Sequence, residues 1–312
     1  MIDFSAKPLF LAPLAGLSDL PFRGVVKAHG CDVTVSEMLS ANALVYEGAK
    51  TLAMAAKNPA ETPYIAQLEG GDPEMIRRAV LVLNEIDGID GIDLNCGCPV
   101  PKVVKQNAGS ALLKDPALLC HLVEIIKKTS NKRYTSVKLR LGFDSVTLPS
   151  FVRDIESAGA DFIAVHARTR SGGFTSEPKY EVLGEIKSNL KIPLVANGSI
   201  DETNAAEVLA ITGADGLMIG RAAIGKPWIF ESIKEALGDG NSNLNVSQAH
   251  KKQVIKEHFA AMIAHYGEHG VSIFRKHLHE YSRGLGGASE FRREINELRS
   301  SEEMRAAIER FF

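Results

Sequence analysis

The chain has 312 residues, of which 45% are apolar and 24% are charged, as in ordinary globular proteins with a sizeable core. This length corresponds to about two domains, or to one barrel of ~250 residues with an extension. The formal net charge of −2 excludes a whole-chain attraction to nucleic acid, so any such binding must come from a local patch.

The cysteine content and the N-terminus indicate the cellular compartment. The four cysteines, Cys31, Cys96, Cys98 and Cys120, are too few for a disulfide scaffold, and we expect Cys31 and Cys120 to be buried in apolar surroundings. The N-terminus lacks the basic flank and apolar core of a signal peptide. No apolar run approaches the 18 residues of a membrane span. We therefore expect a reduced, cytoplasmic protein without membrane contact.

Short apolar runs rich in β-forming residues alternate with amphipathic helical patterns along the chain. The expected strands are 8–15, 33–38, 64–68, 91–95, 136–141, 162–166, 193–196 and 216–219. The expected helices include 73–86, 116–129, 148–158, 180–190, 202–212 and 228–237. Three of them begin at Asp72, Asp115 and Asp201, each followed by Pro or Glu, which is typical of a helix N-terminus.

Eight strands that alternate with helices predict the α/β class, with a parallel sheet closed into a (β/α)8 TIM barrel. The alternative is an open doubly wound sheet, which normally carries a Gly-rich dinucleotide loop after its first strand. Here the first strand is followed by Ala15, Gly16, Leu17 and Ser18, which do not match that loop. The barrel is therefore favoured.

The last part of the chain has a different pattern. Turn residues concentrate at 238–243, which indicates a linker. Beyond it only helical periodicity is found, as in 254–263, 271–278 and 295–308, so we expect about four helices there. The predicted domains are a catalytic barrel over 1–240 and an all-α domain over 245–312.

Functional residues of such barrels lie at the C-terminal ends of the strands, where the loops meet at one mouth. Seven of the expected strands carry polar or small residues at these ends. They are 12–16, Gln67, Asn95 with Cys98, 138–140, 166–169, 197–199, and Gly220 with Arg221.

Cys98 lies between Gly97 and Pro99, just past the end of the fourth expected strand. Unpaired cysteines are often small core residues, and we assign that role to Cys96. A thiol held in a tight turn at the barrel mouth is instead placed for chemistry. Cys98 is therefore the candidate catalytic residue.

The loops after the seventh and eighth strands contain Asn197-Gly198 and Gly220-Arg221, at positions where TIM barrels often bind phosphate. The alternative is that these glycines only form tight turns, but two such loops at the expected strands favour a phosphate site. Lys138 would face the same mouth and needs a negative partner there. A reduced flavin would supply one; a salt bridge to a carboxylate such as Glu37 is the alternative.

Taken together, these motifs resemble one known family, the tRNA-dihydrouridine synthases, and most closely its bacterial B-type branch. In the barrel the resemblance rests on Gln67 and on segments 12–16, 94–99, 137–140, 166–169, 197–198 and 219–221. In the helical region Arg275, Lys276 and His277, followed by Tyr281, resemble the Arg-Lys-His motif of the family's tRNA-binding domain. The combination covers nearly the whole chain in the right order.

The resemblance implies an FMN-dependent enzyme that reduces particular D-loop uridines of tRNA to 5,6-dihydrouridine, with NADPH as the electron donor. It implies that Cys98 is the proton donor and that Asn95 contacts the target uracil. The residues that would hold FMN are Pro13, Leu14, Ala15, Gln67, Lys138, His166, Asn197, Gly198, Ser199, Gly220 and Arg221. The family often has Met at position 14 and an acidic residue at position 199, departures that affect only side-chain roles.

The implied chemistry suits these residues. Saturation of the uracil C5–C6 bond needs a hydride at C6 and a proton at C5, and a thiol of ordinary pKa, ~8.5, still carries its proton at neutral pH. The uridine must be flipped out of the folded tRNA to reach the barrel mouth. Candidate phosphate contacts, for which a solvated surface is the alternative, are Arg140, Arg168, Arg170, Arg275, Lys276, Arg283, Lys102 and Lys105.

Two other functions stay open. One is an FMN-dependent enzyme similar to dihydroorotate or dihydropyrimidine dehydrogenases that acts on a free pyrimidine, against which the helical domain argues. The other is a catalytically silent tRNA-binding factor, against which the intact Cys98 and Lys138 argue. His265 and His269 have helical i,i+4 spacing but no third ligand, so no metal site is expected. We expect a monomer.

Overall fold

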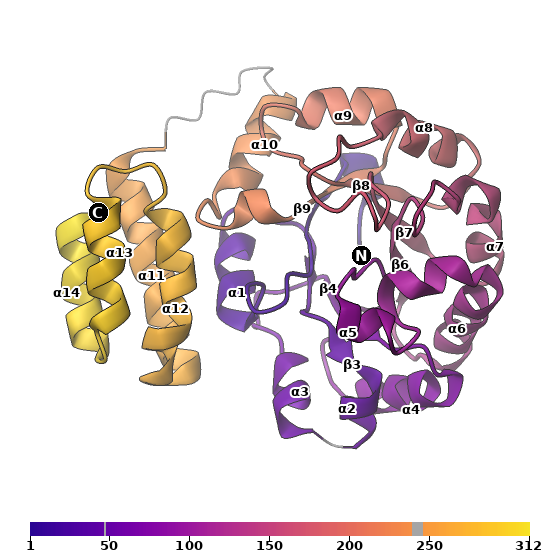
Figure 1. The fold of residues 1–312 in the computed structure, drawn as a ribbon, viewed down its shortest axis with the longest axis horizontal. Helices are drawn as coiled ribbons and strands as arrows, with labels where there is room; N and C mark the ends of the chain where they lie inside the picture. Colours follow the sequence, from indigo (N-terminus) through magenta and orange to yellow (C-terminus); the bar gives the residue numbers. More distant parts are fainter. Residues whose placement is uncertain (47, 239–245) are drawn as a thin grey trace.

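The computed structural model describes residues 1–46, 48–238 and 246–312, and within them the chain forms a barrel with a bundle of helices beside it (Figure 1). All strand pairs of the sheet are parallel. The strands are β1 (Leu9–Leu11), β2 (Thr34–Val35), β3 (Leu39–Ser40), β4 (Tyr64–Glu69), β5 (Gly91–Cys96), β6 (Tyr134–Arg140), β7 (Phe162–His166), β8 (Leu194–Asn197) and β9 (Gly216–Ile219). The predicted TIM-barrel class is confirmed.

The sheet closes between its first and second strands. The strand order is β1-β9-β8-β7-β6-β5-β4-β2, and β3 pairs with β4. Val33 bridges the remaining gap, because its carbonyl accepts the N–H of Leu11 at 2.9 Å and its own N–H donates to the Leu9 carbonyl at 3.2 Å. The strands therefore surround a filled interior and direct their C-terminal ends to one mouth.

Two expected strands differ in length from the prediction. The strand expected at 8–15 ends at Leu11, because Pro13 lacks the N–H that would extend the ladder. The strand expected at 33–38 is reduced to Thr34–Val35, and the chain rejoins the sheet at β3, a strand too short for any periodicity to indicate.

Helices surround the barrel (Figure 1). Asp72 and Asp115 cap two of them as predicted, by accepting the N–H groups of Met75 at 2.8 Å and Leu118 at 3.0 Å. The helices are α1 (Leu20–Ala28), α2 (Ala41–Val45), α3 (Ala49–Met54), α4 (Pro73–Asn84), α5 (Pro101–Val104), α6 (Pro116–Thr129), α7 (Val152–Ser157), α8 (Tyr180–Ser188), α9 (Ala205–Thr212) and α10 (Ile229–Gly238).

Two of these helices begin later than predicted. The helix expected at 148–158 is divided into a 3-10 turn over Leu148–Ser150 and α7. The helix expected at 202–212 begins only at Ala205, since the Asp201 carboxylate accepts the N–H of Thr203 at 2.9 Å and forms a turn instead of a cap.

The C-terminal region contains α11 (Gln248–Tyr266), α12 (His269–Tyr281), α13 (Ala288–Glu297) and α14 (Ser301–Phe311). The continuous helix expected at 295–308 is wrong: the chain breaks at Leu298, and Ser300 starts α14 with a capping box that includes Glu303. A capping box specifies a helix start inside a run that is otherwise helical in pattern. Residues 239–243 of the predicted linker lie outside the described residues.

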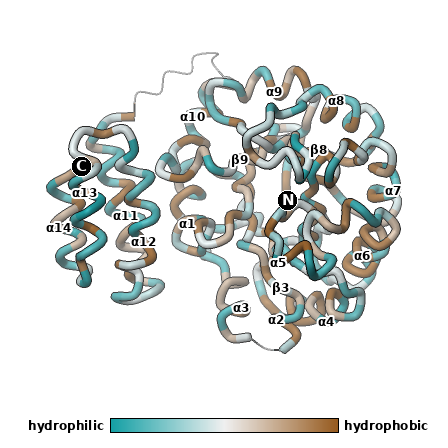
Figure 2. The backbone as a smooth tube through the Cα atoms, in the orientation of Figure 1, coloured by the Kyte–Doolittle hydropathy of each residue, from teal (hydrophilic) through white to brown (hydrophobic). Residues whose placement is uncertain are grey.

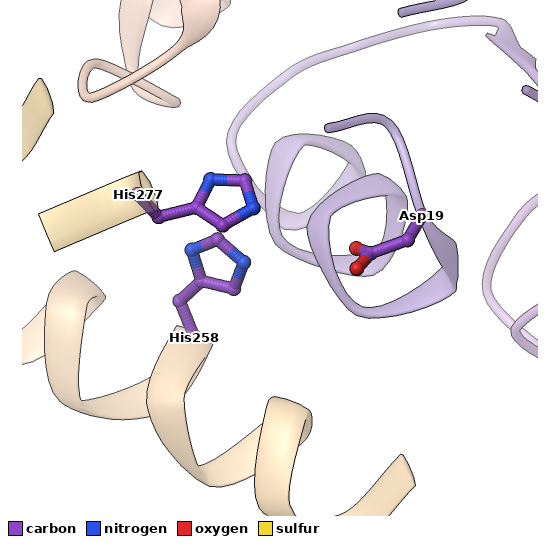
Figure 3. Close-up of side chains that lie close together, drawn as sticks. All are labelled: Asp19, His258 and His277. Carbon is purple, nitrogen blue, oxygen red and sulfur yellow. The ribbon is translucent and has the colours of Figure 1, made fainter. Parts of the chain in front are cut away.

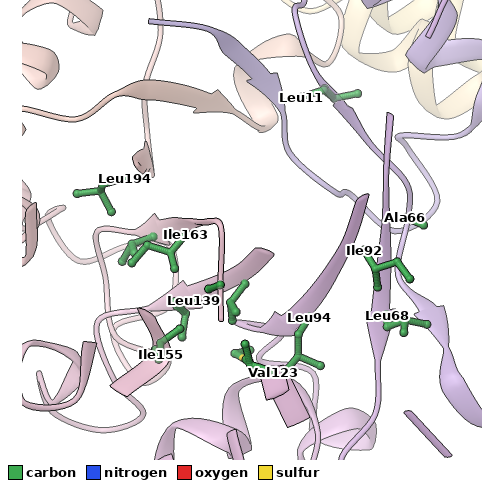
Figure 4. Packing of buried hydrophobic residues seen from close by; sticks show 14 of the residues in the cluster. Leu11, Ala66, Leu68, Ile92, Leu94, Val123, Leu139, Ile155, Ile163 and Leu194 are labelled. Atoms are coloured by element: carbon green, nitrogen blue, oxygen red, sulfur yellow. The ribbon is translucent and has the colours of Figure 1, made fainter. Parts of the chain in front are cut away.

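Successive side chains along each strand point alternately toward the helices and into the barrel interior. The side that faces the helices is apolar. Leu94 and Leu139 point outward and pack in one buried cluster with Val123 of α6 and Ile155 of α7 (Figure 4), and the helices show the matching two-sided hydropathy (Figure 2). Inward-facing residues on the same strands are polar toward the mouth. A separate core forms within the C-terminal helices and includes Trp228 from the barrel side, which joins the two parts.

The burial of the cysteines matches the prediction in part. All four cysteines are free; Cys31 and Cys96 are buried as expected, whereas Cys120 is only half-buried. Among the described residues, no helix combines the length and apolar character that crossing a membrane requires.

Candidate active site

A cavity of about 430 Å³ opens at the carboxyl ends of the strands, within the usual size range of small-molecule sites, ~300–1,000 Å³. It brings together thirteen predicted site residues from the carboxyl ends of six strands and the loops that follow them. They are Pro13, Leu14, Ala15, Asn95, Cys98, Lys138, Arg140, His166, Asn197, Gly198, Ser199, Gly220 and Arg221.

Cys98 forms part of the cavity wall and is held by its backbone. Its N–H donates to Oδ1 of Asn95 at 2.9 Å, and the N–H of Gly97 donates to the same oxygen at 3.1 Å. The side chain is 8% exposed. Burial raises the pKa of the thiol above its ordinary value, although nearby Arg140 and Lys138 lower it. The thiol is therefore protonated at neutral pH and placed to act as an acid.

Behind Cys98 lies a directed chain of buried side chains, which we call the amide chain: Asn95, Gln67 and Asp93. Nδ2 of Asn95 donates to Oε1 of Gln67 at 2.7 Å, and Nε2 of Gln67 donates to Oδ2 of Asp93 at 2.8 Å. Backbone N–H groups only donate and a carboxylate only accepts, so the two ends fix which way both amides point. The amide chain thus orients the turn that carries Cys98.

Strand register explains why these residues meet. Gln67 on β4, Asp93 on β5 and Ser136 on β6 are direct partners across the sheet, so their side chains share one level of the barrel interior. The hydroxyl of Ser136 donates to the second oxygen of Asp93 at 2.6 Å. Burial raises the pKa of Asp93 to about 6, while the hydrogen bonds of Ser136 and Gln67 oppose the rise. Each carboxyl oxygen of Asp93 therefore accepts one hydrogen bond from a neighbouring strand.

Lys138 stands one level higher on β6 and faces the cavity. Its ammonium donates to Oδ1 of Asn197 at 3.1 Å, and Nδ2 of Asn197 donates to the Met218 carbonyl at 2.7 Å. Burial, reinforced by the charge of Arg140, lowers the pKa of Lys138 to about 8. The alternative salt bridge to Glu37 is not formed: Glu37 accepts the N–H of Gly16 instead.

Arg140 and Arg221 meet at the exposed ring of Phe174. The Arg221 guanidinium lies 4.5 Å from the ring centroid and that of Arg140 lies 5.3 Å away, both within cation–π range. Arg140 also donates to the carbonyl of Gly97 at 2.9 Å, so it holds the Cys98 turn together with Asn95. Burial and the charge of Arg168 lower the pKa of Arg140 to about 10, which leaves it cationic.

His166, at the end of β7, is the neutral member of this wall. Its Nδ1 is buried and has no hydrogen-bond partner among the described residues. Burial and the surrounding cations, Lys138 first, lower the pKa of His166 to about 2. A buried ring nitrogen without a partner is one that a bound molecule can satisfy.

The loop after β8 adopts a backbone that glycine permits. Gly198 has φ +122°, and a Cβ there would lie 3.3 Å from both the Ala167 nitrogen and the His166 ring. Its carbonyl accepts the Tyr180 hydroxyl at 2.6 Å, and Ser199 follows in the left-handed region with φ 53°. This loop and the Gly220-Arg221 turn therefore flank one end of the cavity with backbone and a guanidinium.

Four predicted site residues do not line the cavity. Gln67 is fully buried beneath it in the amide chain. Arg168 is 5% exposed and donates to the carbonyl of Ser176 and to Oγ of Ser199 at 3.0 Å. Arg275 and Lys276 lie in the helical region, where Arg275 donates to the Leu298 carbonyl at 2.6 Å and Lys276 reaches across to the Gly16 carbonyl.

The remaining candidate phosphate contacts separate by exposure. Lys102, Lys105 and Arg283 are exposed, whereas Arg170 is half-buried against the ring of Phe143. Residues that the sequence analysis did not select also belong to the site: Asp93 in the amide chain, and Met38, Phe174 and Asp201 in the cavity wall. Only Asp93 had a usable signal, since it alternates with Asn95 on one strand.

The fold and the cavity together define a TIM-barrel protein with its site at the C-terminal ends of the strands. Solved structures of similar fold include morphinone reductase in complex with tetrahydroNAD, with TM-score 0.51, 13% identity and coverage of 78% of this chain and 89% of that one. Another is TcOYE with pHBA, with TM-score 0.53, 8% identity and coverage of 78% and 91%. At these identities the likeness concerns the fold alone.

The sequence comparisons identify the family within that class. The model of the dihydrouridine synthase (Dus) family matches residues 10–312. A probable tRNA-dihydrouridine synthase of Helicobacter pylori is 45% identical over 100% of this chain and 94% of its own length. The tRNA-dihydrouridine synthase B of Pseudomonas aeruginosa is 37% identical over 97% and 92%. The chain belongs to the dihydrouridine synthase family, as the motifs predicted.

Proposed function

We propose that the protein is an FMN-dependent tRNA-dihydrouridine synthase, an oxidoreductase that reduces the C5=C6 bond of specific D-loop uridines with NADPH as electron donor. The observation that carries this proposal is the Cys98 thiol, which is protonated, fixed by its backbone and placed in the wall of a cationic cavity. Family membership and the names of the relatives support the substrate class.

The residues around the cavity fit FMN. The Gly198 loop and Arg221 offer backbone and guanidinium donors to a phosphate, and the partnerless Nδ1 of His166 offers a contact to a polar group. Lys138 favours negative charge that develops beside it. A bound flavin supplies the hydride that uracil C6 receives. The other proposed FMN residues are Pro13, Leu14, Ala15, Asn197, Ser199, Gly220 and, acting through the amide chain, Gln67.

Cys98 then supplies the proton at C5 of the uracil, and the thiolate that remains is stabilised by Arg140 and Lys138, whose charges favour the ionised thiol. Asn95 lines the cavity with an amide of which one N–H is not used by the amide chain, and this group would contact the uracil edge. Because the cavity lies inside the barrel mouth, the uridine reaches it only when flipped out of the tRNA.

We infer the division of labour from the two parts of the chain. The barrel, 1–240, carries the reaction, and the helical domain, 245–312, binds tRNA and orients it over the mouth. The exposed Arg283, Lys102 and Lys105 are the most available phosphate contacts. We assign the same role to Arg140 and Arg168, which are buried, and to Arg275 and Lys276, which are half-buried. We further infer a monomer that works in the cytoplasm.

The test is an assay on undermodified tRNA with purified protein, FMN and NADPH, with dihydrouridine mapped by mass spectrometry. We expect product at one or a few D-loop positions from the wild type. C98A should lose roughly 100-fold or more in rate, the usual contribution of a general acid, and should keep its flavin. C120A, a half-buried cysteine of α6 outside the cavity, is the matched control and should match the wild type.

Two outcomes would overturn the proposal. A flavin-loaded protein that forms no dihydrouridine in tRNA but reduces a free pyrimidine would show that the substrate is wrong. Equal rates for C98A and C120A would show that Cys98 is not the acid.

A further inference from the structure

A second polar cluster lies away from the active-site cavity, where the helical domain meets the barrel. Asp19 immediately precedes α1, while His258 and His277 belong to α11 and α12. All three side chains are buried, and the two imidazoles are fully buried. Each residue offers one ligand atom, and these atoms lie within 4.8 Å of one another. Figure 3 shows the carboxylate of Asp19 directed toward both rings.

The hydrogen bonding of the two histidines is incomplete. Nδ1 of His258 pairs with the hydroxyl of Tyr281 at 3.0 Å, but its Nε2 has no partner among the described residues, and neither ring nitrogen of His277 has one there. Buried polar atoms are nearly always satisfied by protein, water or a bound ion. One such nitrogen on each of the two adjacent rings is therefore available to a group bound between them.

The ligand types suit a metal ion. An imidazole can offer one nitrogen electron pair to a metal, and each of the two rings has a nitrogen that no protein group uses among the described residues. The carboxylate of Asp19 provides the negative charge. Two imidazoles and one carboxylate are a common protein ligand set for zinc, with a water in the fourth position.

Outer contacts already orient the three residues. Tyr281 holds the far nitrogen of His258, and the hydroxyl of Tyr266 donates to Oδ2 of Asp19 at 3.2 Å. The ring of Phe22 stacks on His277 with centroids 5.4 Å apart. Metal-binding histidines and carboxylates are typically held by such second contacts, which fix their orientation.

We propose that Asp19, His258 and His277 bind a zinc ion that links α1 of the barrel to α11 and α12 of the helical domain. Asp19 follows the β1–α1 loop, whose residues Pro13, Leu14 and Ala15 line the active-site cavity. The ion therefore sets how the helical domain sits beside the barrel mouth. Sequence spacing could not reveal this set, because its members come from three distant segments.

The test uses untagged, full-length protein prepared without metal-affinity resin. After incubation with zinc and removal of the unbound ion, we expect close to one zinc per chain by inductively coupled plasma mass spectrometry. With cobalt in its place we expect the visible absorption bands of a tetrahedral Co²⁺ site. Zinc should also raise the melting temperature.

D19N is the informative variant, because asparagine still caps α1 while the charged ligand is lost. We expect zinc affinity to fall roughly 100-fold or more, beyond the usual effect of an outer-contact change. H250A is the matched control: His250 on α11 belongs to a second group with His29 and Glu231, in which His250 and Glu231 are not buried, and its loss should leave the bound zinc in place.

Two results would overturn the proposed zinc site. Wild-type protein that retains no zinc, gives no Co²⁺ bands and shows no thermal shift would overturn the proposal and leave a buried water as the partner of the two rings. Zinc that persists in D19N but is lost in H250A would place the ion at the other group and would equally overturn it. Neither result depends on the tRNA assay, so it leaves the proposed enzyme function untouched.

Discussion

The amide chain beneath the barrel mouth and the two histidines at the domain interface differ in how their buried polar atoms are hydrogen-bonded. In the mouth, the amide chain of Asn95, Gln67 and Asp93 uses each of its hydrogen bonds to hold the Cys98 turn. At the interface, His258 and His277 leave ring nitrogens without partners among the described residues. A hydrogen-bonded network holds its members in one arrangement, whereas buried nitrogens without a protein partner can bind water or an ion. The comparison therefore distinguishes pre-organisation from binding.

Among the variants that test this comparison, the largest effect is expected from replacing Gln67, the middle residue of the amide chain. Q67M removes both hydrogen bonds of a fully buried amide, leaves Asp93 and Asn95 short of a partner, and should lower the rate of dihydrouridine formation on the order of 100-fold, the cost of misplacing a catalytic group by about 1 Å. Stability should fall by about 3 kcal/mol in urea unfolding. S136A removes one hydrogen bond to Asp93 but keeps the chain, so its rate should stay near that of the wild type; similar losses in both variants would contradict an orienting role.

The next largest effect is expected at the end of the cavity that the Gly198 loop and Arg221 flank. R221A removes a guanidinium that faces the cavity beside Phe174, and FMN affinity should drop roughly 10- to 100-fold, the worth of a charge-assisted hydrogen bond. Flavin fluorescence titration measures it. R283A, which changes an exposed arginine on the helical side, is the control and should bind FMN like the wild type. An unchanged affinity in R221A would place the phosphate elsewhere.

A smaller effect follows from Lys138. Its pKa is lowered to about 8 in the free protein, so the ammonium is present below pH 8 and is lost above it, and a bound anion favours the charged form. FMN affinity should thus fall as pH rises, by about tenfold between pH 7 and pH 9 for one titrating group. K138M should bind FMN more weakly and with a flatter profile. A wild-type profile that rises with pH would exclude this lysine as the titrating group.

The smallest effect is expected from the contact that Lys276 makes across the domain interface. Lys276 reaches the Gly16 carbonyl from α12, but it is only half-buried, so K276A should lower the free energy of unfolding by no more than about 1 kcal/mol. R293A, an exposed residue of α13, provides the comparison and should have no measurable effect. If K276A instead cost several kcal/mol, this contact rather than the buried cluster would hold the domains together.

Much of the fold could be predicted because its signals are local. Strand alternation and the caps at Asp72 and Asp115 depend on neighbours in the sequence. The alternation predicted the strands, and the two caps predicted the starts of α4 and α6. The errors fall where a local signal competes with another. Asp201 forms a turn with Thr203 instead of capping α9, and the capping box at Ser300 divides a run that continues to look helical.

The candidate site was predicted as a set of residues but not as an arrangement. Cys98, Lys138 and Arg221 do meet at one cavity, as their positions at strand ends required. Gln67 and Arg168 follow the same rule, yet one lies beneath the cavity and the other turns toward Ser176 and Ser199. A strand-end position specifies a level of the barrel, but it does not specify which neighbour a long side chain will contact.

The sequence by itself therefore determined the barrel, the family and the residues that gather at the mouth, since periodicity, capping and motif order are properties of short segments. Only the tertiary structure decided how polar groups are satisfied. It joined Asp93 to the Cys98 turn, placed Lys276 against the Gly16 carbonyl at the domain interface and brought Asp19 to His258 and His277. The reason is physical: burial and hydrogen-bond partners come from segments far apart in the chain, and they exist only once those segments are packed together.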